Sequence, residues 1–253
     1  MDRLVHTALN SISNLRDQRT VSANNLANMN VPGFRRDLPN EGRAFFVESE
    51  DSFALRAMQL EKGPHAFASS AGFLDQTGQT LDIAIADKGF FYIQPETGGD
   101  PALSRRGDLH VAADGRLTNG AGDQLLSDGL QPITVPPFRN LVVDDGGFIT
   151  IEPLDGAPGE TVQIARLATV VPTDQDLAKG ADGQIRKADN TLPPPNGGAR
   201  VLQGVLEGSN VNSTEELVAS IDLQRTFEIN LRMIKTAQEL DEAGSRLLRM
   251  PEG

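Results

Sequence analysis

The sequence predicts an α+β fold that is mainly β: long N- and C-terminal helices, packed as a coiled-coil-like pair, flank an antiparallel β-rich middle domain. The first observation is the distribution of glycine and proline, since residues 37–212 contain 22 of the 25 glycines and 13 of the 15 prolines. Both residue types break helices and form turns. The second observation is that apolar residues recur every three or four positions at both ends of the chain, as in amphipathic helices.

The first segment predicts a helix that ends before the Val31-Pro32-Gly33 sequence, because proline disfavours helical geometry in the residue before it. Its apolar residues follow a narrow and imperfect heptad pattern. A single helix cannot bury such a face by itself, so the pattern favours a partner helix, and the alternative is a helix that packs on its own domain. The residues of this face that we expect at an interface are Val5, Ala8, Ile12, Leu15 and Leu26.

Three asparagines, Asn24, Asn25 and Asn28, lie three or four positions apart near the end of this helix and so share one face. Two interpretations remain open. A polar face near a helix end is commonly solvated. Alternatively, asparagine amides that pair between subunits fix their register, as a single asparagine does in a coiled coil.

The middle of the chain predicts antiparallel strands. Asp-Gly or Asn-Gly pairs, which favour tight hairpin turns, begin at residues 114, 119, 128, 145, 155, 182 and 196. The β-favouring runs between or beside these turns are 81–86, 90–93, 141–143, 148–151, 162–171 and 201–206. Strands do not alternate with regular helices, which argues against a parallel α/β sheet.

The last segment predicts a longer helix, from Thr214 to Arg249, which would measure about 54 Å at 1.5 Å per residue. Ser213 and Glu216 fit a capping box at its start. A pattern of this length suggests a coiled coil or an interface helix, and the alternative is two shorter helices that meet near Gly244. The residues that we expect at an interface are Leu217, Ile221, Gln224, Phe227, Leu231, Ile234 and Leu240.

These boundaries divide the chain into four parts. We expect an N-terminal helix and turn (1–35), a linker region (36–70), a β-rich middle domain (71–205) and a C-terminal helix (206–253).

The composition excludes several functions. The formal net charge is −12, so a polyanionic partner such as a nucleic acid is not expected. The chain has no cysteine, which excludes disulfides, cysteine-ligated metals and thiol catalysis. The apolar runs are too short to cross a bilayer, and the first residues lack the apolar core of a cleaved signal peptide. We therefore expect neither membrane insertion nor a cleaved signal.

The motifs of catalysis are missing too. There is no phosphate-binding loop and no dinucleotide fingerprint. The Gly208-Ser209-Asn210 sequence lacks the later glycine of a nucleophile elbow. The acidic pairs at 144–145 and 174–176 lack the full set of calcium ligands, so turns explain them better. We predict that the chain is not an enzyme and has no catalytic residue, cofactor or metal site.

Four motifs occur in a specific order. They read Ala-Asn-Asn-Leu-Ala-Asn and Pro-Gly-Phe (23–34), Leu-Asp-Ile-Ala-Ile and Gly-Phe-Phe (81–91), Ser-Arg-Arg-Gly-Asp-Leu (104–109), and Leu-Glu-Gly-Ser-Asn-Val-Asn with Gln-Arg-Thr-Phe-Glu (206–228). Together they resemble the signatures of the flagellar rod and hook family. The chain departs from that family at Val31, Asp87 and Leu109, where threonine, glycine and phenylalanine are usual.

The resemblance implies a structural subunit of the flagellar basal-body rod, which crosses the periplasm and transmits torque as a drive shaft. In such subunits the terminal helices pack together and against neighbouring subunits as an inner tubular layer. The implied partners are copies of the chain itself, other rod proteins and the flagellar type III export apparatus. The chain length and the Pro-Gly-Phe-Arg-Arg sequence are most similar to the proximal rod. The alternatives are a distal rod or hook subunit or, from a different class, a β-rich ligand-binding module.

Overall fold

The computed structural model describes residues 2–39, 44–47, 56–59, 66–86, 88–172, 177–180 and 182–248. The internal contacts divide the chain into two compact units. We call them the helical unit, which contains residues 1–26, 37–63 and 212–253, and the β unit, which contains residues 27–36 and 64–211.

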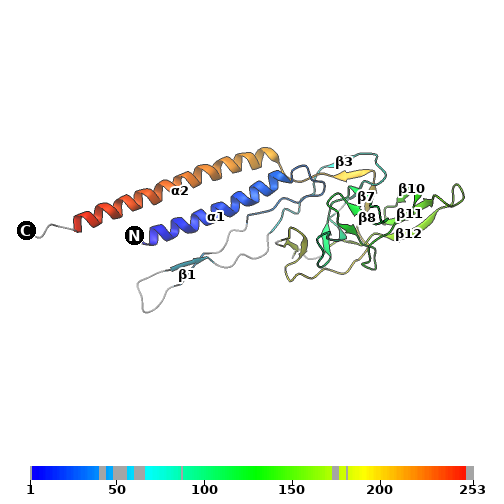
Figure 1. Ribbon diagram of the computed structural model, residues 1–253, viewed down its shortest axis with the longest axis horizontal. Helices are drawn as coiled ribbons and strands as arrows, with labels where there is room; N and C mark the ends of the chain where they lie inside the picture. Colours follow the sequence, from blue (N-terminus) through cyan, green and yellow to red (C-terminus); the bar gives the residue numbers. More distant parts are fainter. Residues whose placement is uncertain are drawn as a thin grey trace, which may run out of the picture. The chain divides into compact units, whose positions relative to one another are not determined.

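Among its described residues, the helical unit contains two helices and one strand pair (Figure 1). The elements are α1 (Asp2–Ala27), β1 (Ala44–Val47), β2 (Arg56–Gln59) and α2 (Ser213–Leu248). The strands β1 and β2 pair antiparallel. The longer helix, α2, has 36 residues and continues through Gly244, so it is not broken there. Within the described ranges, no helix combines the length and the apolar character that crossing a membrane requires.

The two helices lie side by side and run antiparallel (Figure 1). Near the start of α2, the Ser22 hydroxyl donates a hydrogen bond of 2.9 Å to Glu216 Oε2. Farther along, the Asn230 amide donates a hydrogen bond of 3.1 Å to Ser11 Oγ. Both contacts join polar side chains, whereas the sequence predicts an apolar seam.

The predicted coiled-coil-like pair of long helices is therefore wrong. The predicted seam residues Leu217, Ile221 and Leu231 are 50%, 52% and 42% exposed. A groove of about 640 Å³ separates part of α1 from α2, whereas the interlocking side chains of a coiled coil would fill such a space. Phe227 and Ile234 of the predicted pattern are half-buried, but elsewhere the burial falls one residue earlier, at Glu216, Leu223 and Asn230 in place of Leu217, Gln224 and Leu231.

The β unit contains an eight-stranded antiparallel sheet. Its strands are β5 (Phe90–Gln94), β6 (Ala102–Ser104), β7 (Leu109–Val111), β8 (Leu117–Asn119), β9 (Gln124–Leu125), β13 (Thr169–Val170), β14 (Leu177–Lys179) and β15 (Ile185–Lys187). Their order in the sheet is β14-β15-β6-β5-β9-β8-β7, and β13 also pairs with β5.

Three smaller antiparallel sheets complete the described part of this unit. One joins β10 (Phe138–Val143), β11 (Phe148–Pro153) and β12 (Val162–Arg166), and the others pair β4 (Ile83–Ile85) with β16 (Val201–Gln203) and β3 (Leu74–Gln76) with β17 (Val205–Glu207). The predicted antiparallel β-rich middle is therefore confirmed. Two predicted strands are each split in two: the run 162–171 forms β12 and β13, and the run 201–206 forms β16 and β17 around Gly204, whose φ is +74°.

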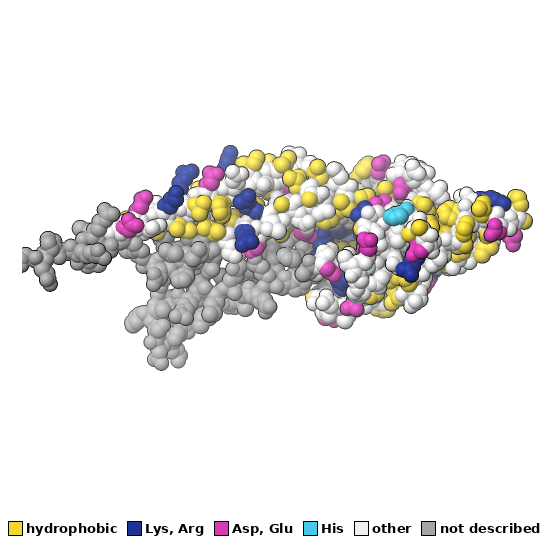
Figure 2. All heavy atoms as spheres, in the orientation of Figure 1, with side chains coloured by type: hydrophobic (Ala, Val, Ile, Leu, Met, Phe, Trp, Pro, Cys, Tyr) yellow, Lys and Arg dark blue, Asp and Glu magenta, His cyan; other side chains and the backbone are white. Residues whose placement is uncertain are grey.

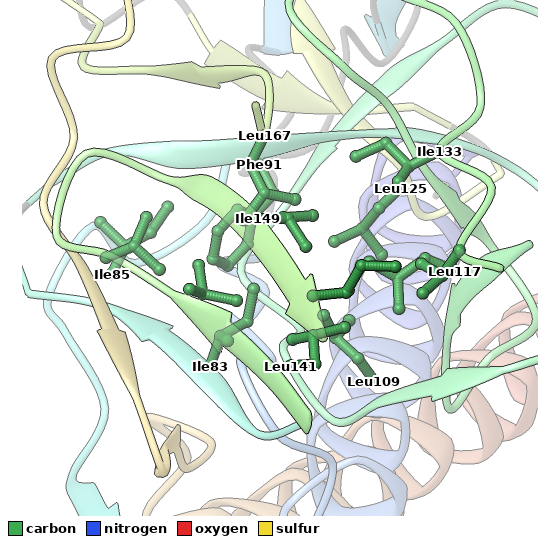
Figure 3. Packing of buried hydrophobic residues seen from close by; sticks show 14 of the residues in the cluster. Ile83, Ile85, Phe91, Leu109, Leu117, Leu125, Ile133, Leu141, Ile149 and Leu167 are labelled. Carbon is green, nitrogen blue, oxygen red and sulfur yellow. The ribbon is translucent and has the colours of Figure 1, made fainter. Parts of the chain in front are cut away.

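Two hydrophobic clusters form the core of the β unit. The larger cluster draws side chains from several sheets (Figure 3), and among them Ile83, Leu125 and Ile149 have no exposed surface. The second cluster surrounds Tyr92 and Leu103. Among the described residues, neither cluster includes a side chain of α1 or α2.

Candidate functional site

The helix α2 carries apolar side chains on the sides that are not turned toward α1. Seven of them are between 42% and 61% exposed: Leu217, Val218, Ile221, Ile229, Leu231, Met233 and Leu240. We call this set the outer face of α2. Figure 2 shows hydrophobic side chains exposed along the helical unit, interspersed with Lys and Arg. A helix that is apolar around most of its circumference is normally buried, so the outer face is a candidate protein interface.

The structure distributes the predicted interface residues over several environments. On α2, the exposed ones are Leu217, Ile221, Gln224, Leu231 and Leu240, and the half-buried ones are Phe227 and Ile234. On α1, Leu15 is buried and Ile12 and Leu26 are half-buried, whereas the side chains of Val5 and Ala8 lie outside those that the structure describes. Their contact with another subunit stays a prediction.

The predicted asparagines do not share one environment. Asn25 is buried: its Oδ1 accepts the Asp37 N–H at 2.7 Å, and its Nδ2 donates to the Asp37 carbonyl at 3.0 Å and to Glu216 Oε1 at 3.2 Å. Asn24 is exposed, and its amide donates to Asp37 Oδ2 at 2.6 Å. Asn28 is half-buried. The amides of Asn24 and Asn25 therefore have partners within a single chain, and a register function between subunits stays a prediction.

A different residue from the predicted one caps α2. Asn212 Oδ1 accepts the Thr214 N–H at 3.1 Å, as an N-cap side chain does. The predicted capping box of Ser213 and Glu216 is wrong, because the Glu216 carboxylate is buried and accepts hydrogen bonds from α1. The sequence pattern identified an acidic residue in the first turn but could not show its distant partners.

A buried ionic cluster lies within the β unit. The carboxylate of Glu207 accepts hydrogen bonds from Arg35 at 2.7 Å, from Arg105 Nε at 2.6 Å and from the Gly72 N–H at 2.8 Å. Burial lowers the pKa of the Arg35 guanidinium from its usual value, while the nearby Glu207 carboxylate acts in the opposite direction. A buried carboxylate is tolerated only when such partners compensate for its lost hydration. We call these four residues the Glu207 cluster.

The neighbouring residues reinforce this cluster. Asn210 Oδ1 accepts the Arg36 N–H at 2.6 Å, and Asn210 Nδ2 donates to the Ser70 carbonyl at 2.8 Å. Gly33 has a φ of +68°, and a Cβ on it would lie 2.3 Å from the carbonyl carbon of Arg105. The Pro-Gly-Phe motif and the Glu-Gly-Ser-Asn motif therefore meet inside the β unit.

Sequence reasoning did not select the Glu207 cluster as a site. The available indication was an acidic residue that directly follows the apolar pair Val205-Leu206 in a β-favouring run. An acidic residue in this position usually marks the end of a strand and is exposed to solvent. Only the tertiary structure, which brings two arginines to it, shows that it is buried.

The described residues contain no group of three His, Asp or Glu side chains that could hold a metal ion. Asp144 Oδ1 accepts the Gly146 N–H at 2.9 Å, and Ser209 Oγ accepts the Val211 N–H at 3.3 Å, so both side chains stabilise turns. The other acidic pair, at 174–176, lies outside the described residues.

Comparison with known proteins gives consistent matches along the chain. Residues 84–151 match the family described as flagellar hook protein FlgE/F/G D1 domain, and residues 202–247 match the family described as flagellar basal body rod FlgEFG protein C-terminal. The chain is 31% identical to the flagellar basal-body rod protein FlgF of Salmonella typhimurium and 32% identical to FlgF of Escherichia coli. Each match covers 99% of this chain and 100% of the relative. The rod protein FlgG of Bacillus subtilis is 27% identical over 95% of this chain and 97% of its own length.

Proposed function

Because the chain belongs to the FlgF family of flagellar basal-body rod proteins, we propose that it assembles helically through its terminal helices as part of the rod that transmits torque. This family is structural, so the chain is a structural protein of the basal body and not an enzyme. Its partners are other rod proteins and, in our proposal, copies of itself.

The observation that carries the proposal is the exposed outer face of α2. Burying a Leu or Ile side chain stabilises a protein by about 1.5–3 kcal/mol relative to leaving it in water. Leu217, Ile221 and Leu231 are about half exposed in the single chain, so about half of this stabilisation is still available to a neighbouring subunit. A contact between two different surfaces of identical subunits, repeated without closing, produces a helical filament.

Several finer points belong to the same proposal. The similarity to FlgF proteins favours a proximal rod position over a distal rod or hook position. We propose that the chain passes unfolded through the flagellar type III export apparatus to a rod that crosses the periplasm. Its lack of cysteine is compatible with such passage, since no disulfide has to be opened. The four-part division at residues 35, 70 and 205 stays a prediction, and the alternative of a β-rich ligand-binding module gains no support from the family.

The proposal predicts that charged groups on the outer face stop rod assembly without unfolding the chain. We would introduce Ile221→Asp together with Leu231→Asp, because both side chains are exposed and a charge there costs little in the monomer. The expected result is normal export and a folded β unit, but no rod and no motility. Rod formation would be followed by electron microscopy of basal bodies, and motility by swimming in soft agar.

The matched control uses apolar residues of the β unit with similar exposure. Val142 and Leu154 are 48% and 53% exposed, so Val142→Asp with Leu154→Asp adds the same charge to a comparable surface. We expect this control to assemble and swim. Normal motility of the α2 variant, or equal loss in both variants, would refute assembly through the outer face.

A further inference from the structure

We infer that an exposed apolar segment of the β unit in one copy, which we call the tip, docks in the groove between α1 and α2 of a second copy. The tip consists of Phe73, Leu74 and Asp75. This inference rests on the proposed function and adds to it the two surfaces that meet between neighbouring copies.

The tip exposes two large apolar side chains to solvent. Phe73 is 76% exposed, which is more than any other large apolar side chain among the described residues, and Leu74 is 40% exposed. Asp75 is also exposed and places a carboxylate next to them. A phenylalanine in this setting has lost the hydrophobic stabilisation that burial would give, so it is an efficient anchor for a partner.

The backbone that carries Phe73 is held firmly. The Gly72 N–H donates to Glu207 Oε1 at 2.8 Å, and the Gly208 N–H donates to the Phe73 carbonyl at 2.7 Å. A Cβ at Gly72 would lie 1.9 Å from the Gly208 carbonyl oxygen, so the two segments are in close contact. Because this backbone is already ordered, docking of the tip costs little conformational entropy.

The groove has the complementary properties. It measures about 640 Å³, within the range of pockets that hold compact ligands. Its apolar lining comes from Ile12, Ala23 and Phe227, and its basic lining from Arg16 and Arg19. Within the described part of the chain, neither arginine forms an ion pair with a carboxylate. The groove thus offers an apolar floor and two cationic groups to an occupant that carries an aromatic ring and a carboxylate.

Cross-linking tests this pairing directly, because the chain has no cysteine of its own. Two differently tagged copies would be produced in the same cells, one with Gln76→Cys beside the tip and the other with Thr20→Cys in the groove. After oxidation of isolated basal bodies, we expect a disulfide-linked dimer that contains both tags. The control pair, Gln76→Cys with Thr236→Cys, places the second thiol on an exposed part of α2 that does not line the groove, and we expect no dimer.

A charge reversal separates docking from a general loss of structure. Arg16→Glu should lower the yield of the cross-link about tenfold, because two carboxylates would then face each other across the contact. Combining Arg16→Glu in the groove copy with Asp75→Arg in the tip copy should restore the yield to within about twofold of the original pair. Phe73→Ala should abolish the cross-link without unfolding the chain, because the ring is exposed in the single copy.

The inference is overturned if basal bodies form but the dimer does not, or if the Gln76→Cys copy links to a different rod protein. It is also overturned if a link forms only within one copy, or if the combined charge reversal does not restore the yield. These outcomes leave assembly through the outer face of α2 untouched, since that proposal is judged by the Ile221→Asp and Leu231→Asp variant.

Discussion

The Glu207 carboxylate is buried between the guanidinium groups of Arg35 and Arg105, with a backbone N–H as its third partner. Arg35 follows the Pro-Gly-Phe motif near one end of the chain, while Glu207 lies in the motif near the other end. The arrangement explains in physical terms why these two motifs occur together. Removing one member of a buried ion pair leaves an uncompensated charge, so each motif needs the other.

Gly33 provides a test of this close contact. We expect Gly33→Ala to lower the free energy of unfolding of the β unit by about 3 kcal/mol or more, since the change adds both backbone strain and a steric clash. Its Cβ would lie 2.3 Å from the backbone of Arg105. Urea denaturation of the purified chain would measure the change.

The matched control is Gly98→Ala. Gly98 also has a positive φ, +80°, but a Cβ there would meet nothing within 4 Å. Gly98→Ala should therefore lower the free energy of unfolding only by the strain of the left-handed backbone, about 1–2 kcal/mol. Equal losses for both variants would show that the contact with Arg105 contributes nothing.

Tyr92 gives a prediction about pH. Burial raises the pKa of Tyr92 from 10.0 to about 12, and its hydroxyl donates a hydrogen bond to the Pro193 carbonyl. The folded state therefore holds the phenolic proton more tightly than the unfolded state. The resulting contribution to the free energy of unfolding is fully present below about pH 10 and is lost as the pH rises toward about 12.

Absorbance of the phenolate measures this pKa without interference, because the chain has a single tyrosine and no tryptophan. We expect a titration midpoint near 12 in the folded chain and near 10 in urea. A midpoint near 10 in the folded chain would contradict the burial of this hydroxyl.

At the scale of the elements, the start of α2 can be tested by two neighbouring substitutions. Asn212→Ala should destabilise the first turn of α2 by about 1 kcal/mol, because it removes the side chain that accepts the Thr214 N–H. Ser213→Ala should have a much smaller effect, since Ser213 is already the first residue of the helix. Hydrogen exchange of the first-turn amides would distinguish the two variants. A larger effect of Ser213→Ala would show that Ser213 is the N-cap residue, as the capping box requires.

The elements also show how far the sequence could predict the fold. Glycine, proline and apolar spacing identified both helices and eight of the seventeen described strands, because these signals act over a few residues. The break at Gly204 between β16 and β17 was missed, because it depends on a hydrogen bond from the Gly204 N–H to the distant Asp82 carbonyl. The face of α2 that meets α1 was predicted only in part, because Phe227 and Ile234 are half-buried but Leu217 and Leu231 are exposed. With apolar residues around most of the helix, local spacing cannot show that Glu216 is the buried position.

The candidate interface was predictable only in part. Five of the predicted residues of α2 are exposed in the single chain, so their burial against a partner stays a prediction. The two buried networks around Asn25 and Glu207 could not be found in this way. Each depends on polar groups that are far apart in the sequence and neighbours only in the folded chain.

At the scale of the whole molecule, the two units differ in what stabilises them. Both hydrophobic clusters belong to the β unit among the described residues. The helical unit instead leaves seven large apolar side chains of α2 exposed and joins its helices partly through polar contacts. A long helix without extensive packing is marginally stable in water. The helical unit should therefore gain most of its stability from neighbouring subunits.

This difference predicts two separate unfolding transitions in the purified single chain. Tyrosine fluorescence reports only on the β unit, because Tyr92 is the sole tyrosine and lies in its second cluster, whereas ellipticity at 222 nm is dominated by the helices. We expect the helical signal to be lost at lower urea concentration than the Tyr92 signal, which would violate two-state behaviour. Gly33→Ala should move the Tyr92 transition to lower urea and leave the helical transition in place, since both Gly33 and its contact at Arg105 belong to the β unit. Coincident transitions in the unmodified chain would mean that the helices are stabilised by the β unit itself. That result would contradict the idea that the helical unit gains most of its stability from neighbouring subunits.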